Sequence, residues 1–101
     1  MRPTIQLGDW GSAIDVLFVE NGTPLPIGGA DEVLLKLKRP GRDTVEKAAS
    51  IVDGDAGHAR YVIEEGLIDG AGEWMVQGFV SIPGVGAWHT ERGTFLVDSN
   101  L

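Results

Sequence analysis

The sequence predicts an all-β fold, a single antiparallel β-sandwich of about seven strands, and three observations support this prediction. Fifteen glycines and five prolines interrupt the chain at intervals of about ten residues, a spacing typical of short strands joined by turns. The segments between these interruptions alternate apolar and polar side chains. Apolar residues make up 43% of the 101 residues, enough for a packed core but for only one, so we expect a single domain over residues 1–101.

Seven turn signals divide the chain. They are rich in Gly, Pro, Asn and Asp, which favour turn geometry, and they lie at residues 8–11, 21–24, 28–29, 40–43, 53–57, 69–72 and 83–86. The expected strands are the segments between them, at residues 12–20, 31–39, 44–52, 58–64, 73–82 and 87–97.

Two of these segments alternate clearly. In residues 12–20, Asp15 lies opposite an apolar face formed by Ile14, Val16 and Phe18, as in a half-buried strand. In residues 73–82 the apolar face consists of Trp74, Val76, Val80 and Ile82. Gly78 interrupts that face, and a glycine inside a strand predicts a bulge.

The segment from Ala30 to Arg39 fits two structures. Ala30, Val33, Leu34 and Leu37 match a helical face with Asp31 as a possible N-cap, whereas Val33, Leu35 and Leu37 match the inner face of a strand. We favour the strand, because residues 40–43 form a natural hairpin turn into residues 44–46. Residues 44–50 also contain good helix formers, and a short helical turn is possible from Glu64 to Asp69.

Charge and composition exclude several classes of protein. Fifteen acidic against eight basic residues give a net charge of −7, which opposes contact with nucleic acid or an anionic membrane. The chain contains no cysteine, so it has no thiol chemistry. The first residues lack the apolar region of a signal peptide, and no apolar run approaches the roughly 20 residues that span a bilayer. We expect a soluble protein made in the cytoplasm.

No pattern in the sequence predicts catalysis, a cofactor or a metal site. Only His58 and His89 are available as histidines, and a turn and a loop or edge strand are their simplest settings. Asp53-Gly54-Asp55-Ala56-Gly57 begins like a calcium loop but lacks the third ligand and the flanking helices. No serine stands in a nucleophile elbow, and no glycine-rich turn opens a helix. The sequence therefore predicts a protein that is not an enzyme.

The tryptophans are more informative. Trp74 is expected in the core, where an aromatic ring fills the space between two sheets. Trp10 and Trp88 lie beside glycines, in turns or at strand ends, where an exposed aromatic side chain favours an interface. Together with Val85 and His89 they are the candidate interface residues, and partial burial at the ends of the sandwich is the alternative for the two tryptophans.

The succession of segments also resembles a known family. A strand at Ile14–Val19 leads into Asn21-Gly22-Thr23-Pro24-Leu25-Pro26-Ile27, which resembles a "dG.pldl" stretch, and residues 29–41 resemble "Ga.v.l.~~kpdG". Residues 67–74 resemble "l..aG.y" with Trp74 in the aromatic position, and residues 94–97 resemble a closing "f.~~V". In this order the segments resemble the N-terminal, immunoglobulin-like domain of phage upper baseplate proteins, over residues 12–97. Residues 88–93 do not follow the family's pattern.

The resemblance implies an immunoglobulin-like sandwich that serves as a structural module of the phage tail or baseplate. It would dock to other virion proteins and to copies of itself, be made in the host cytoplasm and reside in the virion. The alternative is a carbohydrate- or ligand-binding sandwich, with or without assistance from calcium, in which Trp10, Trp88, Asp53 and Asp55 make the contacts.

Overall fold

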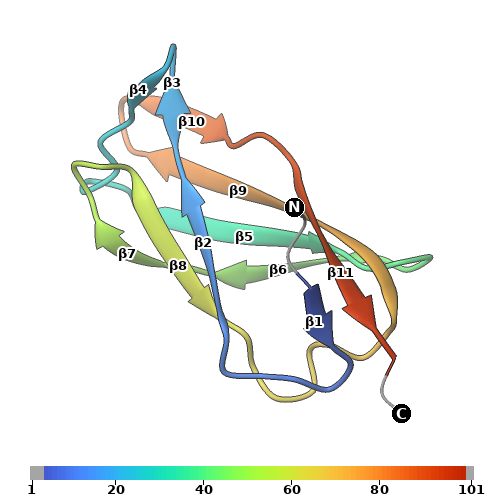
Figure 1. The fold of residues 1–101 in the computed structure, drawn as a ribbon. Coiled ribbons are helices and arrows are strands. Elements are labelled where there is room, and N and C mark those ends of the chain that lie inside the picture. The colour runs from blue at the N-terminus through green and yellow to red at the C-terminus, as the bar shows by residue number, and fades with distance from the viewer. Residues whose placement is uncertain (1–3, 100–101) are drawn as a thin grey trace.

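The computed structural model describes residues 4–99 and places eleven strands and no helix in that range (Figure 1). The strands are β1 (Thr4–Gln6), β2 (Ala13–Leu17), β3 (Val19–Glu20), β4 (Thr23–Pro24), β5 (Glu32–Lys38), β6 (Thr44–Ala48), β7 (Ser50–Asp53), β8 (His58–Val62), β9 (Gly72–Ile82), β10 (Gly86–His89) and β11 (Gly93–Asp98). Six of them have five or more residues, and the short ones account for the excess over the expected seven.

The strands form two layers, so the prediction of an all-β sandwich is confirmed. The large sheet has the order β1-β11-β9-β5-β6, with β10 also paired to β9, and the small sheet has the order β2-β8-β7. Figure 1 shows the small sheet crossing in front of the large one. A separate hairpin of β3 and β4 lies at one end. Asn21 and Gly22 turn it with positive φ angles of 52° and 78°, the conformation that favours an Asn-Gly pair.

The ambiguous segment at residues 30–39 is a strand. Val33, Leu35 and Leu37 are buried on its inner side, and the turn at residues 40–43 leads into β6 as an antiparallel hairpin. The expected strand at residues 44–52 is divided in two at Ala49, whose N–H donates to the Val33 carbonyl at 2.9 Å. There the chain passes from the large sheet to the small one, because β6 pairs with β5 and β7 pairs with β8.

Three details of the expected fold are wrong. The segment Glu64–Asp69 forms no helical turn, because Gly66 has a φ of 87° and the bond from Leu67 N–H to the Glu64 carbonyl closes an ordinary turn. The sandwich is not wholly antiparallel, since β1, which was not expected as a strand, pairs in parallel with β11. Gly78 makes no bulge, and the β5–β9 register runs unbroken through the pair Leu35 and Gly78.

The core between the sheets contains two apolar clusters. Trp74 is fully buried at 0% exposure, as expected, and its ring stacks on Phe95 with 5.7 Å between centroids. Its indole N–H donates to the Gly70 carbonyl at 2.9 Å, which satisfies its one polar atom. The lower cluster, named by its place in Figure 1, comprises Leu35, Leu37, Tyr61, Ile63, Ile68, Trp74, Phe95 and Val97. The upper cluster comprises Phe18, Ile27, Val33, Ala59 and Val80.

Candidate interaction surface

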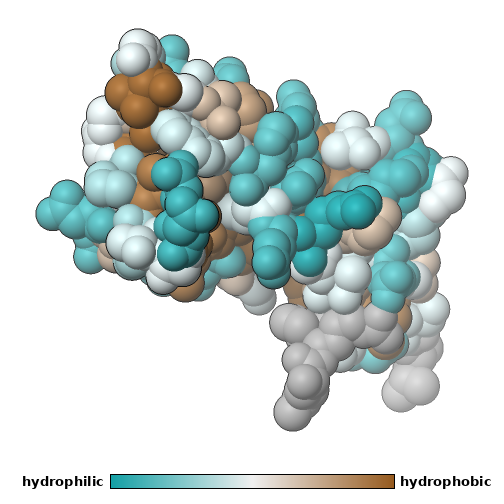
Figure 2. Space-filling view, turned by 90° about the horizontal axis from the view of Figure 1, so that it is seen from above, coloured by the Kyte–Doolittle hydropathy of each residue, from teal (hydrophilic) through white to brown (hydrophobic). Residues whose placement is uncertain are grey.

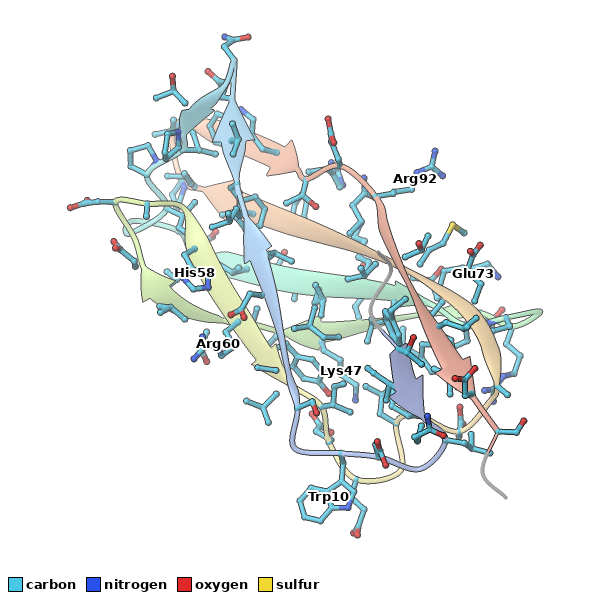
Figure 3. All side chains as sticks on the ribbon, in the orientation of Figure 1. Trp10, Lys47, His58, Arg60, Glu73 and Arg92 are labelled. Atoms are coloured by element: carbon cyan, nitrogen blue, oxygen red, sulfur yellow. The ribbon has the colours of Figure 1, made fainter. Side chains whose placement is uncertain are left out.

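The four candidate interface residues lie at two opposite ends of the molecule. Val85, Trp88 and His89 belong to the hairpin of β9 and β10. Trp10 lies in the loop after β1, where the neighbouring Gly11 N–H donates to the Ile63 carbonyl just beyond β8. Figure 3 shows Trp10 projecting from the end that is remote from β10. The structure therefore brings three of the four residues together and leaves Trp10 apart.

Trp88 is a structural residue more than an exposed platform. Its side chain is half-buried against the upper cluster, and its indole N–H donates to Glu20 Oε2 at 2.5 Å. That hydrogen bond joins β10 of the large sheet to the β3–β4 hairpin. Of the two readings of Trp88, partial burial at the end of the sandwich is the one that the structure supports.

The other three candidates are exposed. Val85 is 69% exposed in the turn between β9 and β10, and Trp10 is 59% exposed. His89 lies on the outer face of the large sheet, where its ring packs on Phe79 with 5.0 Å between centroids. Figure 2 looks onto the end that carries β3, β4 and β10, and shows hydrophobic surface gathered on one side of it.

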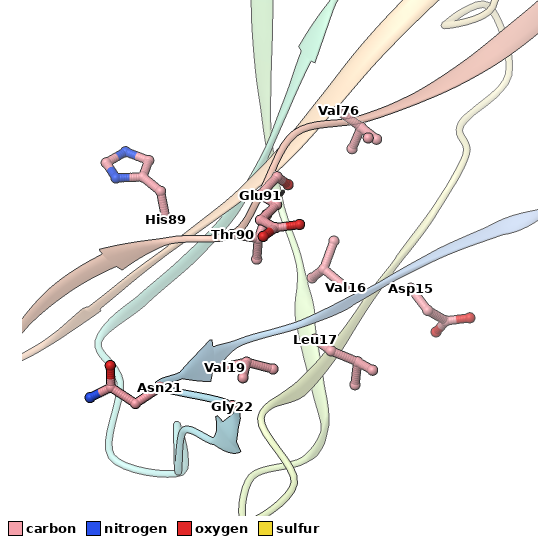
Figure 4. A pocket seen from close by; sticks show the side chains of 11 residues that line it. Asp15, Val16, Leu17, Val19, Asn21, Gly22, Val76, His89, Thr90 and Glu91 are labelled. Atoms are coloured by element: carbon pink, nitrogen blue, oxygen red, sulfur yellow. Dashed lines mark hydrogen bonds between the residues drawn. The ribbon is translucent and has the colours of Figure 1, made fainter. Parts of the chain in front are cut away.

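A cleft of about 640 Å³ lies beside this end, between the two sheets. Its first wall comes from the small sheet and the β3–β4 hairpin, as Asp15, Val16, Leu17, Val19, Asn21 and Gly22. Its second wall comes from the large sheet and the β10–β11 connection, as Val76, His89, Thr90, Glu91 and Gly93. Figure 4 shows the two walls facing each other, with the His89 ring directed away from the first wall.

Two apolar residues of the first wall were missed by the sequence reading. Leu17 is 59% exposed and Val19 is 53% exposed, although both stand in a segment whose apolar face was assigned to Ile14, Val16 and Phe18. Those three residues do point inward, and Phe18 is fully buried. The signal for an interaction surface was the outward series Asp15, Leu17, Val19, because two of its three members are apolar where a solvated face would be polar.

The outer face of the small sheet carries an ion cluster beside this cleft. Asp15 Oδ1 accepts hydrogen bonds from Arg60 Nε at 2.7 Å and lies 2.9 Å from His58 Nε2. Figure 3 shows His58 and Arg60 side by side on β8. The hydrogen bonds from Arg60 and then from His58 lower the pKa of Asp15 below its usual value. His58 is the first residue of β8 and not part of the turn after Gly57.

A second, smaller hollow of about 310 Å³ lies on the outer face of the large sheet, and its charged lining residues are all basic. Lys36, Lys38 and Arg92 line it together with Thr44, Met75 and Gln77. Glu46 lies 3.8 Å from Lys36, whereas Arg92 has no ion-pair partner among residues 4–99. Cations are therefore concentrated on one outer face of a protein that carries a net charge of −7.

The residues assigned to an alternative calcium-assisted site do not assemble into one. Asp53 Oδ1 accepts the Ala56 N–H at 3.3 Å, so it closes its own turn at the start of β8. Trp10 lies beyond the far end of the same strand. Within residues 4–99, no group of three or more His, Cys, Asp or Glu side chains converges as metal ligands would. That range also contains no helix long and apolar enough to cross a membrane.

The fold is shared with a solved phage protein. The N-terminal domain of phage TP901-1 ORF48 superposes with a TM-score of 0.73, over 97% of this chain and 85% of that chain, at 19% sequence identity. No known family profile matches the sequence, and no curated protein sequence matches it either. At this identity the likeness shows a common fold, and the chain is a β-sandwich of the same kind as that phage domain.

Proposed function

We propose that the chain is a structural protein of a phage virion, a docking module of the tail or baseplate that acts through protein–protein contacts. The observation that carries this proposal is the likeness to the phage ORF48 domain, which extends over 97% of the chain. The ordered resemblance of residues 12–97 to upper baseplate proteins points the same way. Its partners are other virion proteins and copies of itself.

The surface supports a docking role. Leu17, Val19 and Val85 are large apolar side chains more than half exposed, and Leu17 and Val19 line the cleft between the sheets. Exposed apolar groups rimmed by charged ones are typical of interaction sites. The net charge of −7 keeps free subunits soluble until a partner covers these residues.

The chemistry of the cleft favours docking over catalysis. Thr90 Oγ1 lies 2.8 Å from the Gly78 N–H, which donates to it, and 2.9 Å from the Glu91 carbonyl. The His89 ring packs on Phe79, and Asp15 is held by Arg60 and His58. The Thr90 hydroxyl, the His89 ring and the Asp15 carboxylate are thus each engaged with neighbours, so we propose a non-enzymatic role.

Mass spectrometry of purified phage particles tests the proposal. The chain is expected in intact particles at a fixed ratio to the other tail proteins, and electron microscopy with a specific antibody is expected to label the tail. Val85→Asp is expected to reduce incorporation into particles, because it places a charge on the most exposed apolar side chain of the β10 end. Asp55→Asn, in the turn before β8, is the control. A chain found only outside the particles would refute the proposal.

A further inference from the structure

One edge of the small sheet carries backbone groups that no strand of residues 4–99 pairs. Phe18 N–H donates to the Gly57 carbonyl at 2.9 Å, and Ile63 N–H donates to the Ser12 carbonyl at 2.8 Å. Both bonds involve even-numbered residues, Ser12 and Phe18, at the two ends of β2. Because hydrogen-bonded and non-bonded positions alternate along an antiparallel pair, Ile14 and Val16 also exchange hydrogen bonds with β8. The N–H and C=O groups of Ala13, Asp15 and Leu17 therefore point away from β8, toward the open edge.

Other sheet edges in the described part of the chain carry features that oppose further pairing. The strand β1 has only three residues, β7 contains a register shift between Ile51 and Asp53, and β6 presents Glu46 and Lys47. Short strands, bulges and charges are the features by which proteins protect their edges. The regular strand β2 has one charged side chain, Asp15, and the bonds that Arg60 and His58 make to it engage its Oδ1 atom.

The cleft lies directly along this edge. Asp15, Val16 and Leu17 of β2 form part of its first wall, and Thr90, Glu91 and Gly93 face them from the second. A strand added to β2 would place alternate side chains between Val16 and Val76, inside the cleft, and the others beside Asp15 and Leu17 on the outer face. Edge pairing and apolar filling are thus available to the same five-residue segment.

The charges of the cleft indicate which strand fits. Asp15 and Glu91 stand on its two walls, and no Lys or Arg occurs among the residues that line it. A second copy of the chain fits poorly, because the fullest antiparallel pairing of β2 with itself places Asp15 opposite Asp15, and like charges in that position are destabilising. A segment that alternates apolar and basic residues would place its apolar side chains between Val16 and Val76 and its basic side chains beside Asp15.

We propose that β2 accepts an extended segment of a different protein as an added strand, with apolar side chains in the cleft and basic side chains beside Asp15. This inference rests on the proposed docking function, whose partner it specifies. Copies of the chain would then meet through other surfaces. Strand addition draws its affinity from main-chain hydrogen bonds and its specificity from the pockets for alternate side chains.

Amide hydrogen exchange followed by NMR tests the proposal with a synthetic peptide, Val-Lys-Val-Lys-Val, capped at both ends. Saturating peptide is expected to slow exchange at the amides of Ala13, Asp15 and Leu17 by at least about tenfold. The amides of Ile14 and Val16 already bond to β8 and are expected to change little. Two control peptides, Val-Glu-Val-Glu-Val and an N-methylated form of the lysine peptide, are expected to leave all five amides unchanged.

A pair of variants at Ala13 separates backbone pairing from side-chain effects. Ala13→Pro removes one outward N–H without touching the bonds to β8, and is expected to weaken peptide binding by about fivefold to tenfold. Ala13→Val keeps the N–H and is expected to bind as the parent does. Circular dichroism and thermal unfolding establish that both variants are folded.

Three outcomes overturn the proposal. They are a lysine peptide that leaves the three outward amides unprotected at millimolar concentration, an N-methylated peptide that binds equally well, and dimers of the free chain that protect the same amides. These results are independent of the particle proteomics above. If the chain is found in virions but β2 accepts no added strand, the docking function stands and this inference fails. If β2 accepts the strand but the chain is absent from virions, this inference stands and the proposed virion function fails.

Discussion

Gly78 lies where two elements of the fold meet, and its replacement by alanine tests the packing of the upper cluster. A Cβ at this position would lie 3.0 Å from Phe18 Cζ and 3.0 Å from Thr90 Cγ2. Neither neighbour is free to move. Phe18 is 1% exposed inside the cluster, and Thr90 is fixed to Gly78 by two hydrogen bonds, of 2.8 Å and 2.9 Å.

The expected change in the free energy of unfolding of Gly78→Ala follows from two opposing effects. Overfilling a packed core costs about 1–3 kcal/mol, while replacing glycine by alanine at a compatible φ returns about 0.4–1 kcal/mol by restricting the unfolded chain. The net expectation is a loss of about 1–2 kcal/mol in the free energy of unfolding. For a domain of this size, that corresponds to a fall in Tm of roughly 5–15 °C.

Gly93→Ala is the matched control, because its Cβ would meet only Val76 Cγ1 at an ordinary 3.5 Å. Urea unfolding followed by tryptophan fluorescence measures both variants. The control is expected to equal or exceed the parent in stability, and Phe18→Leu is expected to cost less in the Gly78→Ala background than in the parent. Equal stability of Gly78→Ala and Gly93→Ala would show that Phe18 and Thr90 do not confine this position.

Three further predictions concern other parts of the fold. Gly57→Ala is expected to lower the free energy of unfolding in urea more than Gly84→Ala does. Both glycines have positive φ, but only the Cβ at residue 57 would lie 2.5 Å from a backbone oxygen. Equal losses of stability would contradict this expectation. Trp74→Ala is expected to cost about 3–5 kcal/mol, whereas Trp10→Ala, at 59% exposure, is expected to stay within about 0.5 kcal/mol, and a large loss at Trp10 would show that it is packed. Because the pKa of Asp15 is lowered in the folded state, the ionised carboxylate stabilises the fold above about pH 4, and this contribution is lost as the pH falls through the lowered pKa. Asp15→Asn is therefore expected to reduce Tm at pH 7 but not at pH 2. An equal reduction at both pH values would refute the pairing of Asp15 with Arg60 and His58.

The fold could be predicted from the sequence because turn residues and alternation are local signals. They defined β5 and its hairpin into β6, and they placed Trp74 in the core. The exchange of sheets at Ala49 could not be predicted, because residues 44–52 contain no glycine or proline that would mark it. The bond from Ala49 to the Val33 carbonyl marks the change of sheet, and it joins residues sixteen positions apart in the sequence.

Glycine was the least predictable residue type for the same reason. Gly78 in a strand pattern indicated a bulge, yet the structure uses its missing side chain to admit Phe18, a residue sixty positions earlier. Gly57 likewise admits the carbonyl oxygens of Phe18 and Leu25. A local pattern records that a side chain is absent, whereas only the tertiary structure shows which distant group occupies the space.

The candidate site was predicted only in part, because the sequence reading judged residues singly. Trp88 was chosen as an exposed aromatic, but Glu20 and the upper cluster cover much of it. The exposed apolar residues of the cleft, Leu17 and Val19, stand in a segment for which only the inner face of Ile14, Val16 and Phe18 was predicted to be apolar. Exposure in a sandwich depends on which edge of a sheet lacks a neighbour, and strand order cannot be derived from alternation alone.

The alternation of β2 separates the stability of the domain from its proposed docking. Ile14 and Val16 pack against the core and bond to β8, whereas Ala13, Asp15 and Leu17 direct their backbone groups toward the open edge and their side chains to the outer face of the sheet. Because a strand has a period of two, one five-residue segment can hold the sandwich together with one set of residues and present a binding edge with the other. Substitutions at Ala13 and Leu17 should therefore alter partner binding at little cost in stability, and substitutions at the even positions should do the opposite. This division would let the docking specificity of such a domain change while its fold is retained, as expected for a module that shares a fold with a phage domain at only 19% identity.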